Sequence, residues 1–144
     1  ATTTAMALAA DPAMVSRQVP FAFNRKEAKD HGEGGVIVGA PLAGKVVIID
    51  DVVTAGLSVD ESVDMIRAAG AAPAAVLIAL DRMERAGQEP ALSPDSAVQA
   101  VALRHGIPVI AIATLDDILS VMRTRPEFAG HEPAVIAYRN RYGI

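Results

Sequence analysis

The chain has 144 residues, of which 51% are hydrophobic, a formal net charge of −4 and a pI near 5.3. This length and apolar content predict a single domain over residues 1–144 with one core. The acidic balance argues against a nucleic-acid-binding surface, and the absence of cysteine excludes a disulfide framework and a thiolate metal site. No apolar run reaches the roughly 18 residues that a membrane span needs, and the N-terminal residues lack a signal-peptide layout. We therefore expect a cytoplasmic protein that binds no membrane.

The first third of the chain predicts short elements joined by polar segments. Residues 5–10 favour a short helix that the following Asp-Pro pair ends, and residues 19–23 favour a strand. Residues 24–35 are polar and close on glycines, so we expect a mobile loop there. Residues 36–38 predict a short strand. After a turn, residues 45–50 predict a buried strand of a parallel sheet, because its apolar residues follow one another without polar alternation.

Helices and strands alternate in the rest of the chain. Ser58 and Glu61 predict a capping box at the start of a helix that ends near Gly70, and residues 76–80 predict the next buried strand. The residues expected on the buried face of this helix are Val59, Val63 and Ile66.

Two more helix starts are predicted by residue pairs, Ser93 with Pro94 and Thr114 with Asp117. The first of these helices should end at Gly106, and residues 109–113 should form a strand. A last helix is expected from about Glu132 to Tyr142. The alternation predicts an α/β fold whose parallel strands are joined by right-handed crossovers.

Asp50 and Asp51 stand at the carboxyl end of the strand over residues 45–50, before a loop of small residues, Thr54 to Ser58. In open α/β sheets, ligands bind beyond the carboxyl ends of the strands. Carboxylates accept hydrogen bonds from hydroxyls, and the N–H groups that open a helix favour a phosphate. The run therefore predicts a site for a sugar phosphate. The alternative is an acidic turn followed by an ordinary helix cap.

A cluster of cationic residues precedes this site in the chain, consisting of Arg25, Lys26, Lys29 and His31. Their charges could converge on a polyanion, and the glycines up to Gly35 would let the segment close over a substrate. Acidic residues are interspersed, so the alternative is a solvated charged loop.

Arg82 follows the predicted strand over residues 76–80 and could bind a planar anionic substrate through its guanidinium group. The alternative is a set of surface ion pairs. His105 and His131 have no partners at ligand spacing, so no protein-only metal site is predicted.

Three runs of the sequence carry a resemblance to a known family. Residues 47–56 resemble the phosphoribosyl-diphosphate signature of type I phosphoribosyltransferases, and residues 23–35 and 80–85 narrow the resemblance to orotate phosphoribosyltransferases. The resemblance implies a type I phosphoribosyltransferase-like parallel sheet flanked by helices. It covers the whole chain, whereas the N-terminal part of the family pattern, including the hood segment, is missing.

The resemblance also implies roles for individual residues. Asp50 and Asp51 would hold the ribose hydroxyls of 5-phosphoribosyl 1-diphosphate, and the loop to Ser58 would wrap its 5-phosphate. Thr54 and Arg82 would contact orotate. The residues implied to bind 5-phosphoribosyl 1-diphosphate are Arg25, Lys26, Lys29, His31, Asp50, Asp51, Val52, Val53, Thr54, Ala55, Gly56, Leu57 and Ser58. The implied catalytic residues are Lys29, Arg25 and His31.

By the same resemblance, the chain would transfer a phosphoribosyl group to orotate, giving orotidine 5'-monophosphate and diphosphate in UMP biosynthesis. Mg²⁺ would be held mainly through the substrate diphosphate. A homodimer is implied, with the segment from Arg25 to Gly35 reaching the partner's site. Two alternatives stay open: a purine-type phosphoribosyltransferase and a non-catalytic regulatory module that senses phosphoribosyl diphosphate.

Overall fold

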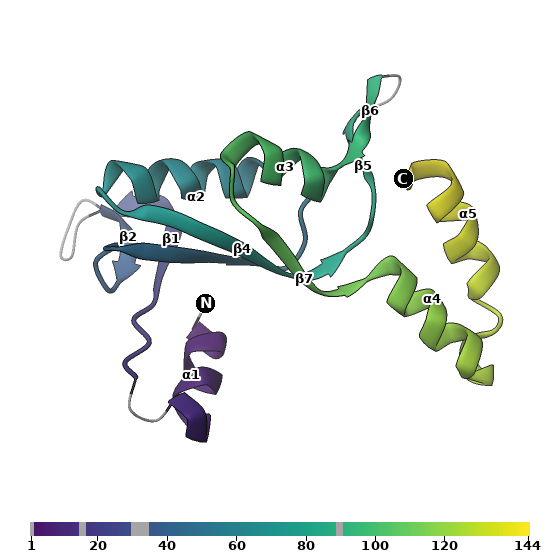
Figure 1. The fold of residues 1–144 in the computed structure, drawn as a ribbon, viewed down its shortest axis with the longest axis horizontal. Helices are drawn as coiled ribbons and strands as arrows, with labels where there is room; N and C mark the ends of the chain where they lie inside the picture. Colours follow the sequence, from purple (N-terminus) through teal and green to yellow (C-terminus); the bar gives the residue numbers. More distant parts are fainter. Residues whose placement is uncertain (1, 15–16, 30–34, 89–90) are drawn as a thin grey trace. The chain divides into compact units, whose positions relative to one another are not determined.

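The computed structural model describes residues 2–14, 17–29, 35–88 and 91–144 (Figure 1). Contacts within the chain divide it into two compact units, Ala1–Ala43 and Gly44–Ile144. Whether the two units make one folding domain is not tested by this division, so the single domain stays a prediction. None of the helices in the described ranges is both long and apolar enough to cross a membrane.

The first unit contains a helix and a two-stranded ribbon. Its elements are α1 (Thr2–Ala10), a 3-10 turn at Pro12–Met14, β1 (Ala22–Lys29) and β2 (Gly35–Gly39). The predicted helix is confirmed and is three residues longer at its start. β1 pairs antiparallel with β2, with Phe23 opposite Val38, and the register shifts between Asn24 and Lys29.

The ribbon corrects the expected boundaries of the first strand. It begins at Ala22 rather than at residue 19, and it continues through Lys29, which the sequence assigned to a mobile loop. Charged residues do not exclude a strand when it pairs with a neighbouring strand. Pairing with β2 makes this segment a strand, and the polar composition of the segment does not reveal that pairing. Residues 30–34 of the predicted loop lie outside the described residues.

The second unit is built on three parallel strands. They are β3 (Lys45–Asp50), β4 (Ala72–Asp81) and β7 (Val109–Thr114), in the order β3-β4-β7. Ile48 lies opposite Val76, and Ile78 lies opposite Ala111. The predicted α/β fold with a parallel sheet flanked by helices is confirmed.

α2 (Leu57–Ala68) and α3 (Ala97–His105) cover the same face of this sheet (Figure 1). Each new strand is added at the same edge of the sheet, so crossovers of one hand, which the rule for parallel strands makes right-handed, place both helices on one face. The fully buried core lies between these helices and the sheet and includes Val59, Val63, Val76, Ile78 and Val101. The apolar face predicted for α2 is therefore confirmed.

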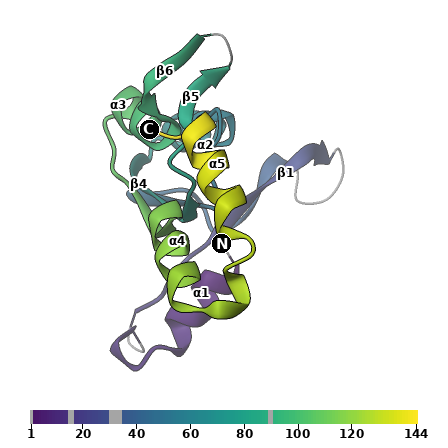
Figure 2. The same cartoon turned by 90° about the vertical axis from the view of Figure 1, so that its right-hand side faces the viewer.

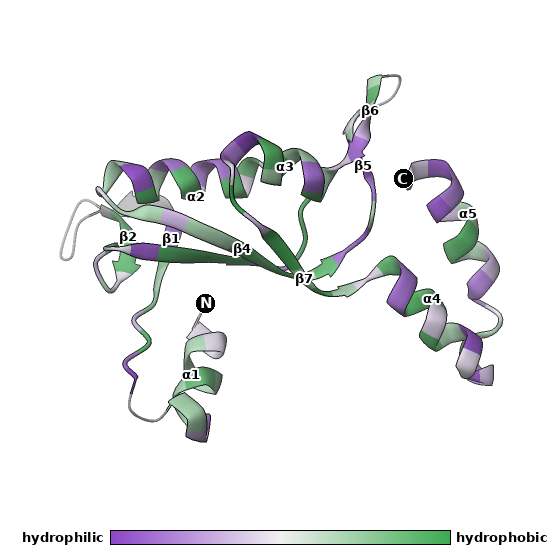
Figure 3. Cartoon of the chain, in the orientation of Figure 1, coloured by the Kyte–Doolittle hydropathy of each residue, from purple (hydrophilic) through white to green (hydrophobic). Residues whose placement is uncertain are grey.

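The strand at residues 45–50 is buried on one face only, which corrects the expectation of an entirely buried strand. Ile48 points into the core and is 8% exposed, whereas Val47 is 47% exposed and Ile112 of β7 is 87% exposed. These strands are mostly green, that is hydrophobic, in Figure 3. Uniform apolarity predicted burial, but both helices pack on one side, so alternate residues differ in exposure.

The remaining elements of this unit are a hairpin and two helices. β5 (Arg85–Gln88) and β6 (Ala91–Ser96) pair antiparallel, a hairpin that the sequence did not predict. α4 (Leu115–Thr124) and α5 (Glu132–Tyr142) lie side by side, joined by an ion pair of 2.8 Å between Arg139 and Asp116 (Figure 2). A 3-10 turn at Pro126–Phe128 connects them. α5 has the predicted bounds.

One of the predicted helix caps forms and another does not. Thr114 and Asp117 make the expected capping box, and the hydrogen bonds from Thr114 hold the pKa of Asp117 below its ordinary value. α3 is capped by Ser96, not by Ser93, because residues 91–96 pair with β5. Ser96 and Gln99 form a complete capping box there, and Gly106 ends the helix with a left-handed φ of 67°.

A polar cluster ties the first turn of α2 to the end of α3. Asp60 accepts hydrogen bonds of 2.6 and 2.9 Å from Arg104 Nη1 and lies 2.6 Å from His105 Nε2. The side chain of His105 is 8% exposed. Burial by itself would raise the pKa of Asp60, but hydrogen bonds from His105 and Arg104, with their charges, outweigh it and lower that pKa below its ordinary value.

This lowered pKa predicts a pH-dependent contribution to stability. A carboxylate whose pKa is lower in the folded state stabilises the fold fully above its unfolded pKa, and this contribution is lost as the pH falls through the folded pKa. Asp60→Asn should therefore lower the free energy of unfolding at pH 7, and the difference from the unaltered chain should shrink below about pH 4. Urea unfolding of both chains at pH 7 and pH 3 measures this. A difference that stays the same at both pH values would contradict the role of the Asp60 charge.

Candidate phosphate and acidic-turn site

The acidic pair forms a compact turn at the carboxyl end of β3. Asp50 Oδ1 accepts a hydrogen bond from the backbone N–H of Asp51 at 3.0 Å, and Asp51 Oδ1 accepts one from Val52 N–H at 2.8 Å. The carbonyl of Asp51 accepts hydrogen bonds of 2.9 and 3.1 Å from the N–H groups of Ala79 and Leu80 in β4. The turn is thus fixed to the neighbouring strand, while the Asp51 side chain remains exposed.

Ser58 connects this turn to the first turn of α2. Its hydroxyl donates a hydrogen bond of 2.7 Å to Asp50 Oδ2. The capping box predicted for Ser58 and Glu61 is wrong, because α2 begins at Leu57 with Gly56 as its N-cap and without a side-chain cap. Ser58 therefore lies inside the first turn of α2, and its hydroxyl donates across the loop to the carboxylate at the strand end.

Gly56 sets the course of the loop between Asp51 and α2. Its φ of 82° lies in the left-handed region, and a Cβ at this position would stand 2.6 Å from Cγ2 of Val101 in α3. Both observations require glycine. Val53 anchors the loop at 6% exposure, whereas Thr54, Ala55, Leu57 and Ser58 face solvent. An exposed loop that enters a helix N-terminus presents backbone N–H groups that favour an anion.

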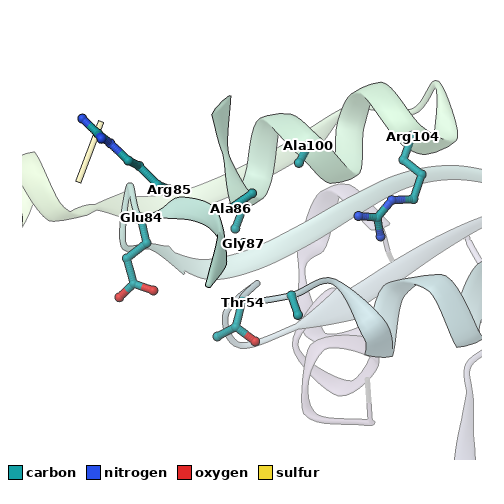
Figure 4. Close-up of a pocket in the computed structure, with 9 residues that line it drawn as sticks. Thr54, Glu84, Arg85, Ala86, Gly87, Ala100 and Arg104 are labelled. Carbon is teal, nitrogen blue, oxygen red and sulfur yellow. The ribbon is translucent and has the colours of Figure 1, made fainter. Parts of the chain in front are cut away.

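A pocket of about 420 Å³ opens beside this loop (Figure 4). Its walls come from the loop itself, from the strand β5 and from α3. The lining residues are Thr54, Ala55, Glu84, Arg85, Ala86, Gly87, Ala97, Ala100 and Arg104. Arg104 reaches from α3 toward the loop that carries Thr54, as Figure 4 shows. Sequence reasoning missed Arg104, because a basic residue in the last turn of a helix is common and carries no site signal.

Arg82 lies in a turn at the carboxyl end of β4. Its Nη2 forms an ion pair of 2.9 Å with Glu84 Oε2. Arg82 Nε and Glu84 Oε1 are buried, and neither has a hydrogen-bond partner among the residues that the structure describes. Such atoms cost about 1–3 kcal/mol each when unsatisfied, so this pair would gain from new polar partners. Sequence reasoning named Arg82 and gave Glu84 no role.

The cationic residues predicted for the polyanion site belong to the first unit. Arg25, Lys26 and Lys29 lie in β1, and His31 lies outside the described residues. Within the described ranges, no three His, Cys, Asp or Glu side chains gather to form a metal site. A cation at Asp50 and Asp51 would take its other ligands from water or phosphate oxygens, which is the coordination that Mg²⁺ prefers.

Curated relatives match the chain over its whole length. It is 68% identical over 144 residues to the orotate phosphoribosyltransferase of Bordetella petrii and 58% identical over 144 residues to that of Marinobacter nauticus. The chain spans 64% of the length of each of these relatives. No family model matches the sequence.

Solved structures agree with the sequence relatives. The orotate phosphoribosyltransferase of Francisella tularensis superposes with a TM-score of 0.75 at 29% identity, over 99% of this chain and 64% of that one. The enzyme of that name from Mycobacterium tuberculosis gives a TM-score of 0.51 at 25% identity, over 67% of this chain.

Gly56 offers a test of the loop geometry. Gly56→Ala should lower the free energy of unfolding by about 2–4 kcal/mol, because alanine is strained at a left-handed φ and its Cβ would overlap Val101. Gly130→Ala is the matched control, since its φ is not left-handed and a Cβ there meets nothing within 4 Å. Chemical unfolding of both variants measures the difference. Equal stability of the two would contradict the close packing of the loop on α3.

Proposed function

Because the chain belongs to the orotate phosphoribosyltransferase family, we propose that it binds 5-phosphoribosyl 1-diphosphate and orotate and takes part in their conversion to orotidine 5'-monophosphate and diphosphate. This reaction is a step of de novo pyrimidine synthesis. The proposal extends to the chain the activity for which its relatives are named.

The main structural support for this proposal is the hydrogen bond that Ser58 donates to Asp50. It joins a carboxylate pair, which accepts hydrogen bonds from hydroxyls, to the helix N-terminus that favours a phosphate. A ribose 5-phosphate carries both groups, with its hydroxyls and its phosphate at opposite ends of the sugar. Asp50 and Asp51 hold the ribose hydroxyls in this proposal, and residues Thr54 to Ser58 wrap the 5-phosphate.

Arg82 and Thr54 contact orotate in this proposal. Orotate is planar and carries a carboxylate, which a guanidinium group can bind through two parallel hydrogen bonds. The buried Nε of Arg82 supports this role, because it lacks a hydrogen-bond partner among the described residues and a ligand carboxylate would supply one.

The reaction transfers a ribosyl group between two nucleophiles. A ring nitrogen of orotate loses its proton to solvent and forms a bond to the anomeric carbon, and the bond from that carbon to the diphosphate oxygen breaks, so the electron pair leaves with diphosphate. Lys29 and Arg25 stabilise the negative charge that grows on the leaving group. His31 orients the diphosphate or gives it a proton, and Lys26 contributes a further contact.

Mg²⁺ fits the residues present, because Asp50 and Asp51 offer carboxylates without forming a complete protein cage. When bound, the ion would supply positive charge to the diphosphate oxygens. We further propose a cytoplasmic homodimer in which the segment from Arg25 to Gly35 acts at the partner's site. These three proposals rest on the family resemblance.

The deciding experiment follows the loss of orotate absorbance after 5-phosphoribosyl 1-diphosphate and Mg²⁺ are added to the chain. Adenine, guanine and uracil are tested in parallel. Of the four bases, we expect turnover only with orotate. Turnover with a purine would identify a purine-type transferase instead. Binding of 5-phosphoribosyl 1-diphosphate without turnover of any base would favour the sensing module and contradict the proposal.

Lys29→Ala tests the role proposed for the leaving-group cation. The variant should lower kcat by about a hundredfold and change the KM for 5-phosphoribosyl 1-diphosphate much less, because charge on diphosphate develops mainly in the transition state. Lys45→Ala is the matched control, since Lys45 is exposed at the opposite end of β3 from the acidic pair. An unchanged kcat for Lys29→Ala would refute this role.

A further inference from the structure

The turn that carries Arg82 is strained. Met83 has a φ of 54°, the left-handed value that only glycine adopts at little cost, and Met83 is the one residue other than glycine with a positive φ in the described part of the chain. Asp81 Oδ1 accepts a hydrogen bond of 2.8 Å from Met83 N–H. Strain of this kind persists only where the surroundings hold the backbone in place.

The two residues after α5 supply much of that support. Ile144 N–H donates a hydrogen bond of 3.1 Å to the carbonyl of Met83, and Gly143 forms an isolated antiparallel bridge with Glu84. Arg85 Nε donates a hydrogen bond of 3.0 Å to the carbonyl of Gly143. These contacts join positions about sixty residues apart in the sequence, so a local turn preference does not produce them.

The other side of the turn is fixed to α3. Ala97 N–H, in the first turn of that helix, donates a hydrogen bond of 2.9 Å to the carbonyl of Glu84. The turn is therefore held from α3 on one side and from residues 143–144 on the other. Between these supports, Arg82 and Glu84 keep the buried atoms Nε and Oε1 without partners among the described residues.

We infer that Gly143 and Ile144 act as positioning residues, which hold the strained turn at Met83 so that Arg82 is oriented for orotate. This inference deepens the proposed function and rests on it. Neither residue contacts the substrate in this account. Their effect passes through the backbone of Met83 and Glu84, so it should change the affinity for orotate and leave the phosphate end of the site unaffected.

A single substitution can remove the supporting hydrogen bond. Ile144→Pro deletes the N–H donor, and Gly143 already has the extended backbone, with φ −81° and ψ 166°, that a residue before proline adopts. Ile144→Ala is the matched control, because it keeps the N–H group and removes only a side chain that is 43% exposed. The two variants separate the hydrogen bond from side-chain packing.

The readouts are the dissociation constants of orotate and of ribose 5-phosphate, measured by titration calorimetry on the full chain. Ile144→Pro should weaken orotate binding about fivefold, which corresponds to the typical free-energy contribution of one hydrogen bond. The binding of ribose 5-phosphate should stay unchanged. Ile144→Ala should change neither. Adding Met83→Gly to Ile144→Pro should recover part of the orotate affinity, because glycine adopts the left-handed conformation without the support.

Several outcomes would overturn the inference. The first is that Ile144→Pro leaves the orotate dissociation constant unchanged. The second is that it weakens the binding of orotate and ribose 5-phosphate equally. The third is that adding Met83→Gly recovers none of the orotate affinity. Failure of the proposed function is distinguishable, because the unaltered chain would then bind no orotate at all. If the unaltered chain and Ile144→Pro bind orotate equally tightly, only the positioning role is rejected.

Discussion

The parallel register of β3, β4 and β7 is the constraint on which the candidate site depends. Parallel pairing brings the carboxyl ends of all three strands to one edge of the sheet. The carbonyl of Asp51 strengthens this alignment by accepting hydrogen bonds from two successive N–H groups of β4. The acidic turn after β3 and the Arg82 turn after β4 are therefore neighbours because the strands pair, although about thirty residues of chain separate them.

The packing of α2 against α3 then determines the shape of the loop after β3. Gly56 approaches Val101 too closely for any side chain, and Asp60 accepts hydrogen bonds from Arg104 one turn further along α2. Both contacts come from the same helix, so α3 fixes the start of α2 as well as the loop that leads into it. Arg104 also lines the pocket beside Thr54. The same helix, α3, thus both supports the N-terminus of α2 and forms a wall of the pocket.

Local sequence signals were reliable where no tertiary partner competed for the same groups. Thr114 and Asp117 satisfy each other within one helical turn, and their capping box forms as predicted. Ser58 has the same local opportunity, but its hydroxyl bonds Asp50 across the loop. Ser93 was also expected to cap a helix, but residues 91–96 pair with β5 and move the cap to Ser96. In both failures, contacts made outside the predicted helical turn outweighed a capping preference worth about 1 kcal/mol.

The sequence by itself determined the alternation of strands and helices, the apolar face of α2, and the acidic turn at the end of β3. These features depend on periodicity and on residues close together in the chain, which sequence patterns record directly. Only the tertiary structure decided the one-sided burial of the sheet, the extension of β1 through Lys29, and the strained turn at Met83. The contacts of Arg104, Glu84 and Ile144 were also decided there. The extension of β1 depends on its pairing with β2, and the one-sided burial and the held turn depend on contacts between segments far apart in sequence, which no local pattern specifies.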